Sequence, residues 1–116
     1  MVDKEKMKLA FLNIIVNAIE AMDKPEKVLN IRTKSLGDKC VVEFRDNGVG
    51  MDEETIQKLF EPYFTGKLKG NGLGLTNTQN IILNHRGNIN VRSIPTQGST
   101  FIVTLNMGEE KPNMTV

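Results

Sequence analysis

The chain has 116 residues, a formal net charge of +1, 39% apolar residues and 25% charged residues, which is the composition of one ordinary domain. This near-neutral charge excludes a strong global field, so we expect no nucleic-acid or membrane partner for these residues. One cysteine, Cys40, and one histidine, His85, exclude an intrachain disulfide and a metal site built from several such side chains. Without a leader sequence or a bilayer-length apolar run, the expected location is cytoplasmic, and membrane anchoring of a parent protein stays open.

A first helix is predicted over residues 4–22, where apolar side chains recur with a period of 3.6 residues. Asn13 and Asn17 lie on its polar stripe and, being four residues apart, are neighbours on the helix surface. Asn is a mediocre helix former, and Glu or Lys would serve better at exposed positions. Two interpretations stay open for this pair: an ordinary solvated stripe, or two amides placed for binding.

Beyond that helix, short alternating runs predict strands, and glycine or proline clusters predict the turns between them. Strand pairs separated by helices favour an α+β fold, a two-layer sandwich in which helices cover one face of a sheet. The predicted elements are strands over 28–33 and 40–45, a short helix over 52–58, a loop over 59–71, a helix over 73–85, strands over 88–93 and 100–105, and a polar tail from 108.

Two glycine clusters, at residues 46–50 and 70–74, flank the predicted loop. Glycine lets a backbone approach a ligand closely, and a glycine-rich turn at a helix N-terminus exposes N–H groups to an anion. Thr65, Lys67 and Lys69 lie between the clusters and add a hydroxyl and two positive charges suited to phosphate oxygens. The glycine spacing fits neither the P-loop nor the dinucleotide fingerprint. The segment predicts a site for a ligand with a polar ring at one end and phosphates at the other.

Asp46 ends a predicted strand at the start of the first glycine cluster. An ionised carboxylate only accepts hydrogen bonds, so Asp46 suits the exocyclic amine of adenine and not the carbonyl of guanine. An ordinary Asp-Asn-Gly turn is the alternative interpretation. Asn17 offers an amide oxygen to magnesium, which prefers oxygen ligands and shares them with nucleotide phosphates, and Asn13 could position a water or a phosphate.

The aromatic residues of the loop, Phe60, Tyr63 and Phe64, either anchor a lid or belong to the core beneath it. His85 ends a predicted helix, where the dipole favours a capping histidine over an exposed phosphoacceptor. Gly87 is the predicted stop signal of that helix.

Taken together, five segments resemble the motifs of the GHKL superfamily, in the family's order and spacing, from about residue 3 to residue 105. The F box and the Leu-Gly-Leu form of the G2 box are specific to sensor histidine kinases within that superfamily. Two positions depart from the pattern: Asn71 stands where Thr or Ser is usual, and Arg86 replaces a usual Gly. The matching segments are 13–18 (N box), 46–50 (G1 box), 60–67 (F box), 70–75 (G2 box) and 98–100 (third glycine motif).

The resemblance implies a Bergerat α/β sandwich with a mixed, mostly antiparallel sheet, which binds ATP and Mg²⁺. Asp46 would bond the adenine amine, Asn17 would ligate the metal, and Thr100 would lie near adenine. Asn13 stands where ATP-hydrolysing members carry a Glu base, and Asn cannot take a proton from water at neutral pH; slow hydrolysis is therefore expected, with Asn13 and Lys67 as the catalytic residues. The other implied nucleotide-binding residues are Gly48, Gly50, Thr65, Lys67, Gly70, Gly72, Leu73 and Gly74.

The implied function is that of the catalytic domain of a two-component sensor histidine kinase, over residues 1–107. Such a domain transfers the γ-phosphate of ATP to a histidine on a dimerisation hairpin of the parent kinase. The receiver domain of a response regulator then takes the phosphoryl group from that histidine. The family's hairpin and first strand precede the N box, so we expect an N-terminally truncated fragment with a flexible tail over 108–116. An anti-sigma-type serine/threonine kinase and a non-catalytic nucleotide-binding module stay open as alternatives.

Overall fold

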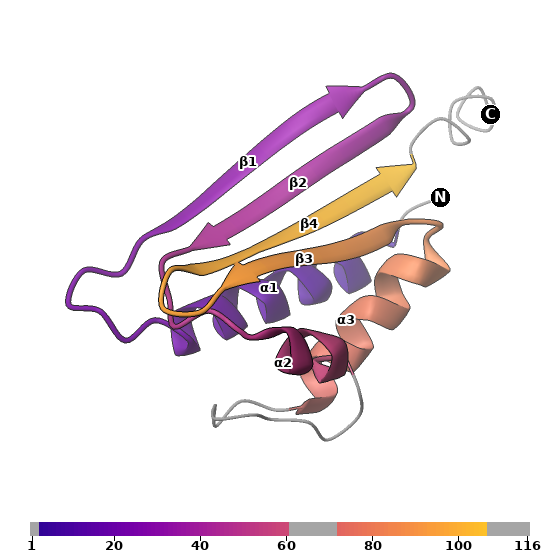
Figure 1. Ribbon diagram of the computed structural model, residues 1–116. Helices are drawn as coiled ribbons and strands as arrows, with labels where there is room; N and C mark the ends of the chain where they lie inside the picture. The colour runs from indigo at the N-terminus through magenta and orange to yellow at the C-terminus, as the bar shows by residue number, and fades with distance from the viewer. Residues whose placement is uncertain (1–2, 61–71, 107–116) are drawn as a thin grey trace, which may run out of the picture.

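A computed structural model describes residues 3–60 and 72–106, which form a four-stranded sheet with helices packed on one face (Figure 1). The strand order is β1-β2-β4-β3, and every pairing among these strands is antiparallel. The expected two-layer α+β sandwich is confirmed, and the described strands contain no parallel pair. The elements are α1 (Lys4–Glu20), β1 (Leu29–Leu36), β2 (Lys39–Asp46), α2 (Glu53–Lys58), α3 (Gly72–Asn84), β3 (Asn88–Ile94) and β4 (Gly98–Asn106).

Helix α1 begins at a side-chain cap and buries one apolar stripe. The carboxylate of Asp3 accepts hydrogen bonds from the backbone N–H groups of Glu5 and Lys6, both at 3.1 Å, which satisfies donors that a helix start leaves unpaired. The helix ends two residues earlier than predicted, at Glu20. Its buried residues recur every three or four positions, as expected for a helix on a sheet: Met7, Ala10, Ile14 and Ala18.

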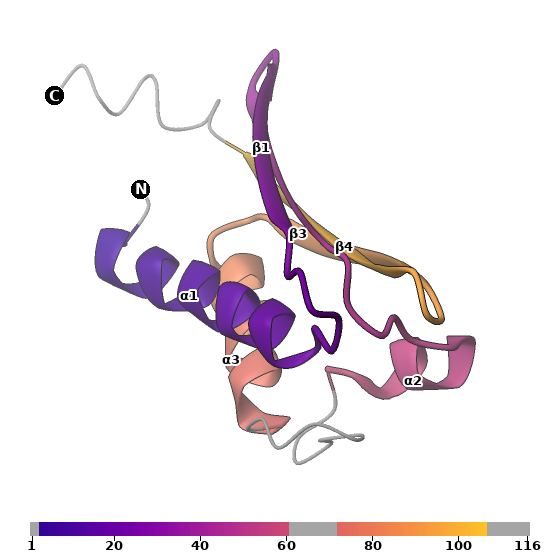
Figure 2. The same ribbon diagram turned by 90° about the vertical axis from the view of Figure 1, so that its left-hand side faces the viewer.

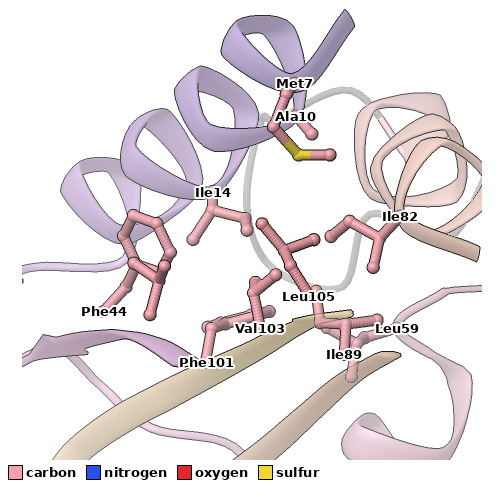
Figure 3. Packing of buried hydrophobic residues seen from close by; sticks show 11 residues of the cluster. Met7, Ala10, Ile14, Phe44, Leu59, Ile82, Ile89, Phe101, Val103 and Leu105 are labelled. Carbon is pink, nitrogen blue, oxygen red and sulfur yellow. The ribbon is translucent and has the colours of Figure 1, made fainter. Parts of the chain in front are cut away.

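The core lies between the sheet and the helix pair α1 and α3 (Figure 3). Ile14 of α1 and Ile82 of α3 are fully buried against Phe101 and Val103 of β4. Burying an aliphatic or aromatic side chain of this size contributes about 1.5–3 kcal/mol. The ring of Phe11 meets that of Phe44 edge-on, with centroids 5.5 Å apart. This core fixes α1 against β2 and β4, the two strands that carry the candidate site.

The β1–β2 hairpin has longer strands than predicted. Leu36 pairs with Lys39, so only two residues connect the strands. Gly37 is the first of them and has a φ of +61°, as a type II′ turn requires of its first central residue. The strands therefore run to the turn itself, beyond the predicted limits of 33 and 40.

The end of α3 corrects the predicted stop signal. Arg86, not Gly87, adopts the left-handed conformation, with a φ of +62°. The N–H of Gly87 donates to the carbonyl of Ile82 at 2.9 Å, the six-to-one bond of a Schellman motif. Gly87 is required for a different reason: a Cβ there would lie 2.7 Å from the carbonyl oxygen of Thr104 on β4.

Seen from the side, the sheet has one covered face and one open face. Figure 2 shows α1 and α3 on the same side of the twisted sheet, and no described helix lies against the other side. None of the helices in residues 3–60 and 72–106 is long and apolar enough to span a membrane.

Candidate nucleotide-binding site

Asp46 is the last residue of β2 and is only 5% exposed. Its Oδ1 atom accepts hydrogen bonds from the backbone N–H groups of Gly48, at 2.8 Å, and Ser99, at 3.2 Å. Within the described part of the chain, no group donates to the second oxygen, Oδ2. One carboxylate oxygen is therefore held by two protein donors, while the other keeps its capacity to accept a hydrogen bond.

Burial is the largest influence on the charge of this carboxyl. Desolvation raises the pKa of Asp46 above its usual value, while the hydrogen bonds from Gly48 and Ser99 and the positive charge of Lys24 lower it. Desolvation disfavours the ionised form, and donors and a nearby cation favour it. Three protein groups thus support a buried negative charge at the end of β2.

The turn after Asp46 fits between α1 and the β3–β4 connection because it contains glycines. A Cβ on Gly48 would lie 2.5 Å from the carbonyl oxygen of Ala21, which accepts a 2.9 Å hydrogen bond from the N–H of Val49. Gly50 has a φ of +72°, and a Cβ there would collide with the carbonyl of Ile94. Both glycines therefore let this turn pack closely against the backbone carbonyls of Ala21 and Ile94.

Lys24 and Asn47 fasten the segment between α1 and β1 to this turn. The ammonium group of Lys24 donates to the carbonyl oxygens of Asn47, at 2.9 Å, and Thr96, at 3.1 Å. The side-chain amide of Asn47 accepts from the N–H of Val28 at 3.0 Å and donates to the carbonyl of Glu26 at 2.8 Å. The sequence did not predict these contacts. Lys24 precedes a proline, so the only signal at that position was the end of a helix.

On β4, Ser99 and not Thr100 lies beside Asp46. The register pairs Asp46 with Ser99, whose side chain is buried on the helix-facing side. Thr100 pairs with Arg45 and Arg92 and so lies on the open face of the sheet. Thr100, which was expected near adenine, is therefore one residue away from the strand position beside Asp46. The alternation of Phe101, Val103 and Leu105 could have revealed it, since it places odd-numbered residues inside.

Ser99 belongs to a small hydroxyl network that joins β3, β4 and the turn. Its Oγ lies 2.7 Å from the Oγ of Ser93. Ser93 Oγ donates to the carbonyl of Gly98 at 3.0 Å and accepts from the N–H of Met51 at 2.7 Å. Ser99 thus donates to Ser93. The network therefore connects Ser99, whose N–H donates to Asp46, with Met51, the residue that follows Gly50.

Asn13 and Asn17 are both half-buried, one turn apart on α1. At 100° per residue they lie on one flank of the buried stripe, and Phe11 lies on the other, toward Phe44. Figure 3 shows Phe44 and Ile82 of α3 on opposite sides of Ile14. The two amides therefore lie on the α3 side of α1 and are not an ordinary solvated stripe.

The second glycine cluster opens α3. Gly72 is the first residue of the helix, and Leu73 and Gly74 continue its first turn, where backbone N–H groups lack partners within the helix. The start of α3 lies on the side of the helical layer away from the sheet (Figures 1 and 2). Thr76 fastens it, because its hydroxyl donates to the carbonyl of Phe60 at 2.8 Å. Three further predicted site residues, Thr65, Lys67 and Gly70, lie outside the described residues.

His85 is a capping residue, as predicted. Its Nδ1 lies 2.7 Å from the carbonyl oxygen of Ile81, one turn earlier, and its Nε2 lies 3.0 Å from the N–H of Asp3. A carbonyl only accepts and an N–H only donates, so Nδ1 carries the proton and Nε2 accepts. Both ring nitrogens are engaged. Elsewhere in residues 3–60 and 72–106, no group of three His, Cys, Asp or Glu side chains could hold a metal.

Comparison with known proteins agrees with this geometry. Residues 2–109 match the family model described as histidine kinase-, DNA gyrase B- and HSP90-like ATPase. The histidine-protein kinase AtoS of Escherichia coli K12 is 40% identical over 89% of this chain, and sporulation kinase B of Bacillus subtilis is also 40% identical over 89%. The chain covers only 17% and 24% of those two relatives.

Solved structures give the same result. The nucleotide-free catalytic domain of histidine kinase ThkA is 30% identical, with a TM-score of 0.82 over 95% of this chain and 72% of that one. The mycobacterial sensor histidine kinase MprB has a TM-score of 0.81 over 90% of this chain and 72% of that one, and at 23% identity it supports the fold alone. By the family match over nearly its whole length, the chain belongs to the histidine kinase-, DNA gyrase B- and HSP90-like ATPases, a family of ATP-binding domains.

Proposed function

We propose that this chain is the ATP- and magnesium-binding catalytic domain of a two-component sensor histidine kinase, which transfers the γ-phosphate of ATP to a histidine of its parent protein. One observation carries the proposal. Asp46 is buried at the end of β2, with Oδ1 held by two backbone donors and Oδ2 left for a ligand. The likeness to AtoS and sporulation kinase B supports the kinase class.

Asp46 selects the base. Its Oδ2 accepts a hydrogen bond from the exocyclic amine of adenine, while Gly48 and Ser99 hold Oδ1. Guanine would present a carbonyl oxygen to the carboxylate, leaving two acceptors face to face. A site built to hydrogen-bond its ligand discriminates strongly, because a mismatched ligand leaves buried polar groups unpaired.

Asn17 holds the metal together with the nucleotide phosphates. Its neutral amide is half-buried on the α3 side of α1, and a single amide oxygen suits Mg²⁺, which keeps several waters and shares phosphate oxygens. When bound, the ion neutralises phosphate charge. Asn13, one turn earlier, positions a phosphate or a water without removing a proton, so hydrolysis is slow and transfer to a protein acceptor is favoured.

The phosphates lie at the start of α3, where Gly72, Leu73 and Gly74 present backbone N–H groups. The same role extends to Thr65, Lys67 and Gly70 by sequence. Lys67 is proposed as the cation that offsets charge on the transferring phosphoryl group.

The acceptor is a histidine on a dimerisation hairpin of the parent kinase, and a response regulator receives the phosphoryl group from it. His85 is unsuited to this role because Nδ1 binds the Ile81 carbonyl and Nε2 binds the Asp3 N–H. Phosphoryl transfer depends on holding donor and acceptor in line. A ring fixed at the end of α3 cannot reach a γ-phosphate without breaking both contacts.

The test is phosphoryl transfer in trans. The chain is incubated with γ-labelled ATP and Mg²⁺, alone and with the parent kinase's hairpin bearing its histidine. We expect acid-labile, base-stable label on the hairpin only, its loss in Asp46→Asn, and its retention in Thr100→Ala. Label on the chain alone that disappears in His85→Gln contradicts the proposal, and acid-stable label on a serine supports a serine/threonine kinase instead.

A further inference from the structure

The open face of the sheet has a composition that the nucleotide site does not explain. On β4, Ser99, Phe101, Val103 and Leu105 are buried against the helices, so the alternate residues face the other way. The antiparallel register extends this face across the neighbouring strands. Its basic side chains, all exposed, are Arg32, Lys34, Lys39, Arg45 and Arg92.

Positive charge is concentrated on this face. The face carries those five basic residues and one acid, Glu43, whereas the whole chain has a net charge of only +1. The rest of the chain therefore carries more acids than bases. Within the described part of the chain, none of the five basic residues forms an ion pair. Glu43 pairs in register with Arg32 and offsets part of this charge, but the remaining excess of positive charge can orient an anionic partner.

The basic residues surround a less polar centre. Val41 and Ile102 are half-buried on adjacent strands, and Glu43 pairs with Ile102 across the β2–β4 ladder. Arg45 and Arg92 flank this centre at one end, both in register with Thr100. A charged rim around an apolar centre, rich in Arg, is the anatomy of a protein–protein interface.

At the other end of the face, an open pocket of about 310 Å³ is lined by Lys39 and Arg86 with polar groups of β3 and β4. Asn88, Thr104 and Asn106 supply those polar groups. Two cations beside amide and hydroxyl groups suit a carboxylate. Every arginine of the chain therefore lies on this face or at its edge.

We propose that the open face of the sheet docks an acidic surface of a partner protein. Nucleic acid fits less well, because the residues of these strands that lie on the open face include no aromatic side chain for base stacking; Phe44 and Phe101 lie on the buried face. The docking face is opposite the helices that frame the nucleotide site, so the inference stands independently of the proposed function.

The size of the face predicts a transient contact. Four strands about 4.8 Å apart and three steps of about 6.8 Å along each strand span roughly 15 by 20 Å. With its side chains the face lies at or below the roughly 800 Å² per partner of a standard interface. Charge therefore contributes mainly to association rate and to specificity, and binding weakens as salt rises.

The test uses the whole chain and a synthetic peptide rich in Asp and Glu with leucines at its centre, followed by amide NMR shifts. We expect shifts on the open strands, and a Kd raised at least about tenfold by the pair Arg45→Glu and Arg92→Glu. The matched control, Lys6→Glu with Lys27→Glu, changes the net charge equally on exposed positions away from this face and should alter Kd less than about twofold. The neutral pair Arg45→Gln and Arg92→Gln serves as a second variant: it should also weaken binding, and an amide NMR spectrum unchanged outside the substituted positions shows that it is folded.

If the charge-reversed pair and its control lose affinity for the peptide equally, the attraction is nonspecific and the proposal is overturned. So would the absence of peptide shifts at low salt. Duplex DNA and vesicles of phosphatidylcholine with phosphatidylglycerol are titrated in parallel. If either of them shifts the open strands more strongly than the peptide does, the partner is a nucleic acid or a membrane and the proposal is wrong.

Discussion

Replacing Asp46 by Asn separates ligand recognition from folding at the candidate site. The amide has the shape of the carboxylate, so its oxygen can still accept from the N–H groups of Gly48 and Ser99. Its NH₂ group then stands where Oδ2 stood. A donor now faces the adenine amine, which is also a donor. The variant should therefore fold and lose ATP binding.

The magnitude follows from the hydrogen bond that is lost. A hydrogen bond to a charged group contributes about 1.5–3 kcal/mol, and leaving donors unpaired in a buried site adds to the loss. A total of about 2–4 kcal/mol raises the Kd for ATP by roughly 30- to 700-fold. Inosine triphosphate carries a carbonyl in place of the amine, so the preference of Asp46→Asn for ATP over inosine triphosphate should fall or reverse.

The same substitution has a pH signature in the unliganded protein. Burial raises the pKa of Asp46 in the folded state. Between the unfolded pKa and this higher folded pKa, the folded chain binds more protons, so stability falls as pH rises through that window. Asn cannot ionise, so the variant lacks this pH-dependent contribution to the free energy of unfolding. At neutral pH the melting temperature of Asp46→Asn should equal or exceed that of the original chain, with a weaker dependence on acidic pH.

Calorimetric titration with ATP and inosine triphosphate, and thermal unfolding across pH, measure both effects. Thr100→Ala is the matched control, because Thr100 lies on the open face, and its affinity for ATP should stay within about twofold. The reasoning is refuted if Asp46→Asn binds ATP within about threefold of the original affinity, or if the preference between the two nucleotides is unchanged.

Asn17→Ala should weaken Mg-ATP binding more than metal-free ADP binding, and calorimetry showing equal losses would remove the ligand role. Gly48→Ala should destabilise the fold by about 2–4 kcal/mol through its clash with Ala21. Gly37→Ala, with a positive φ and no atom within 4 Å, should cost about 1–2 kcal/mol; equal denaturant midpoints would contradict the steric account. Lys24→Met removes the cation that lowers the pKa of Asp46, so ATP binding should fail at a higher pH than in the original chain. Lys24→Arg should restore the profile, and superimposable profiles for all three proteins would rule out this electrostatic role.

The fold could be predicted from the sequence wherever a periodic pattern repeats over several turns or alternations. The stripe of Ile14 and its neighbours predicts α1, and the alternation around Phe101 predicts β4; the core confirms both. The end of α3 could not be predicted, because sequence does not reveal that Arg86 takes the strained conformation while Gly87 makes room for β4. Such assignments depend on contacts between distant segments.

The same distinction applies to the site. Asp46, Gly48 and Gly50 were accessible to sequence reasoning because their chemistry and spacing are local. The hydrogen bonds of Lys24 could not be predicted, since its partners Asn47 and Thr96 lie far along the chain. The residue of β4 beside Asp46 is Ser99, one position before the predicted Thr100, and in a strand a shift of one residue moves a side chain to the opposite face.

The most direct test of the account is a crystal structure with a non-hydrolysable ATP analogue and Mg²⁺. We predict the adenine amine about 2.7–3.2 Å from Asp46 Oδ2, with Oδ1 still bound to Gly48 and Ser99. The metal should contact Asn17 and the phosphates. An adenine ring placed away from β2, with Asp46 Oδ2 facing only water, would contradict the central claim.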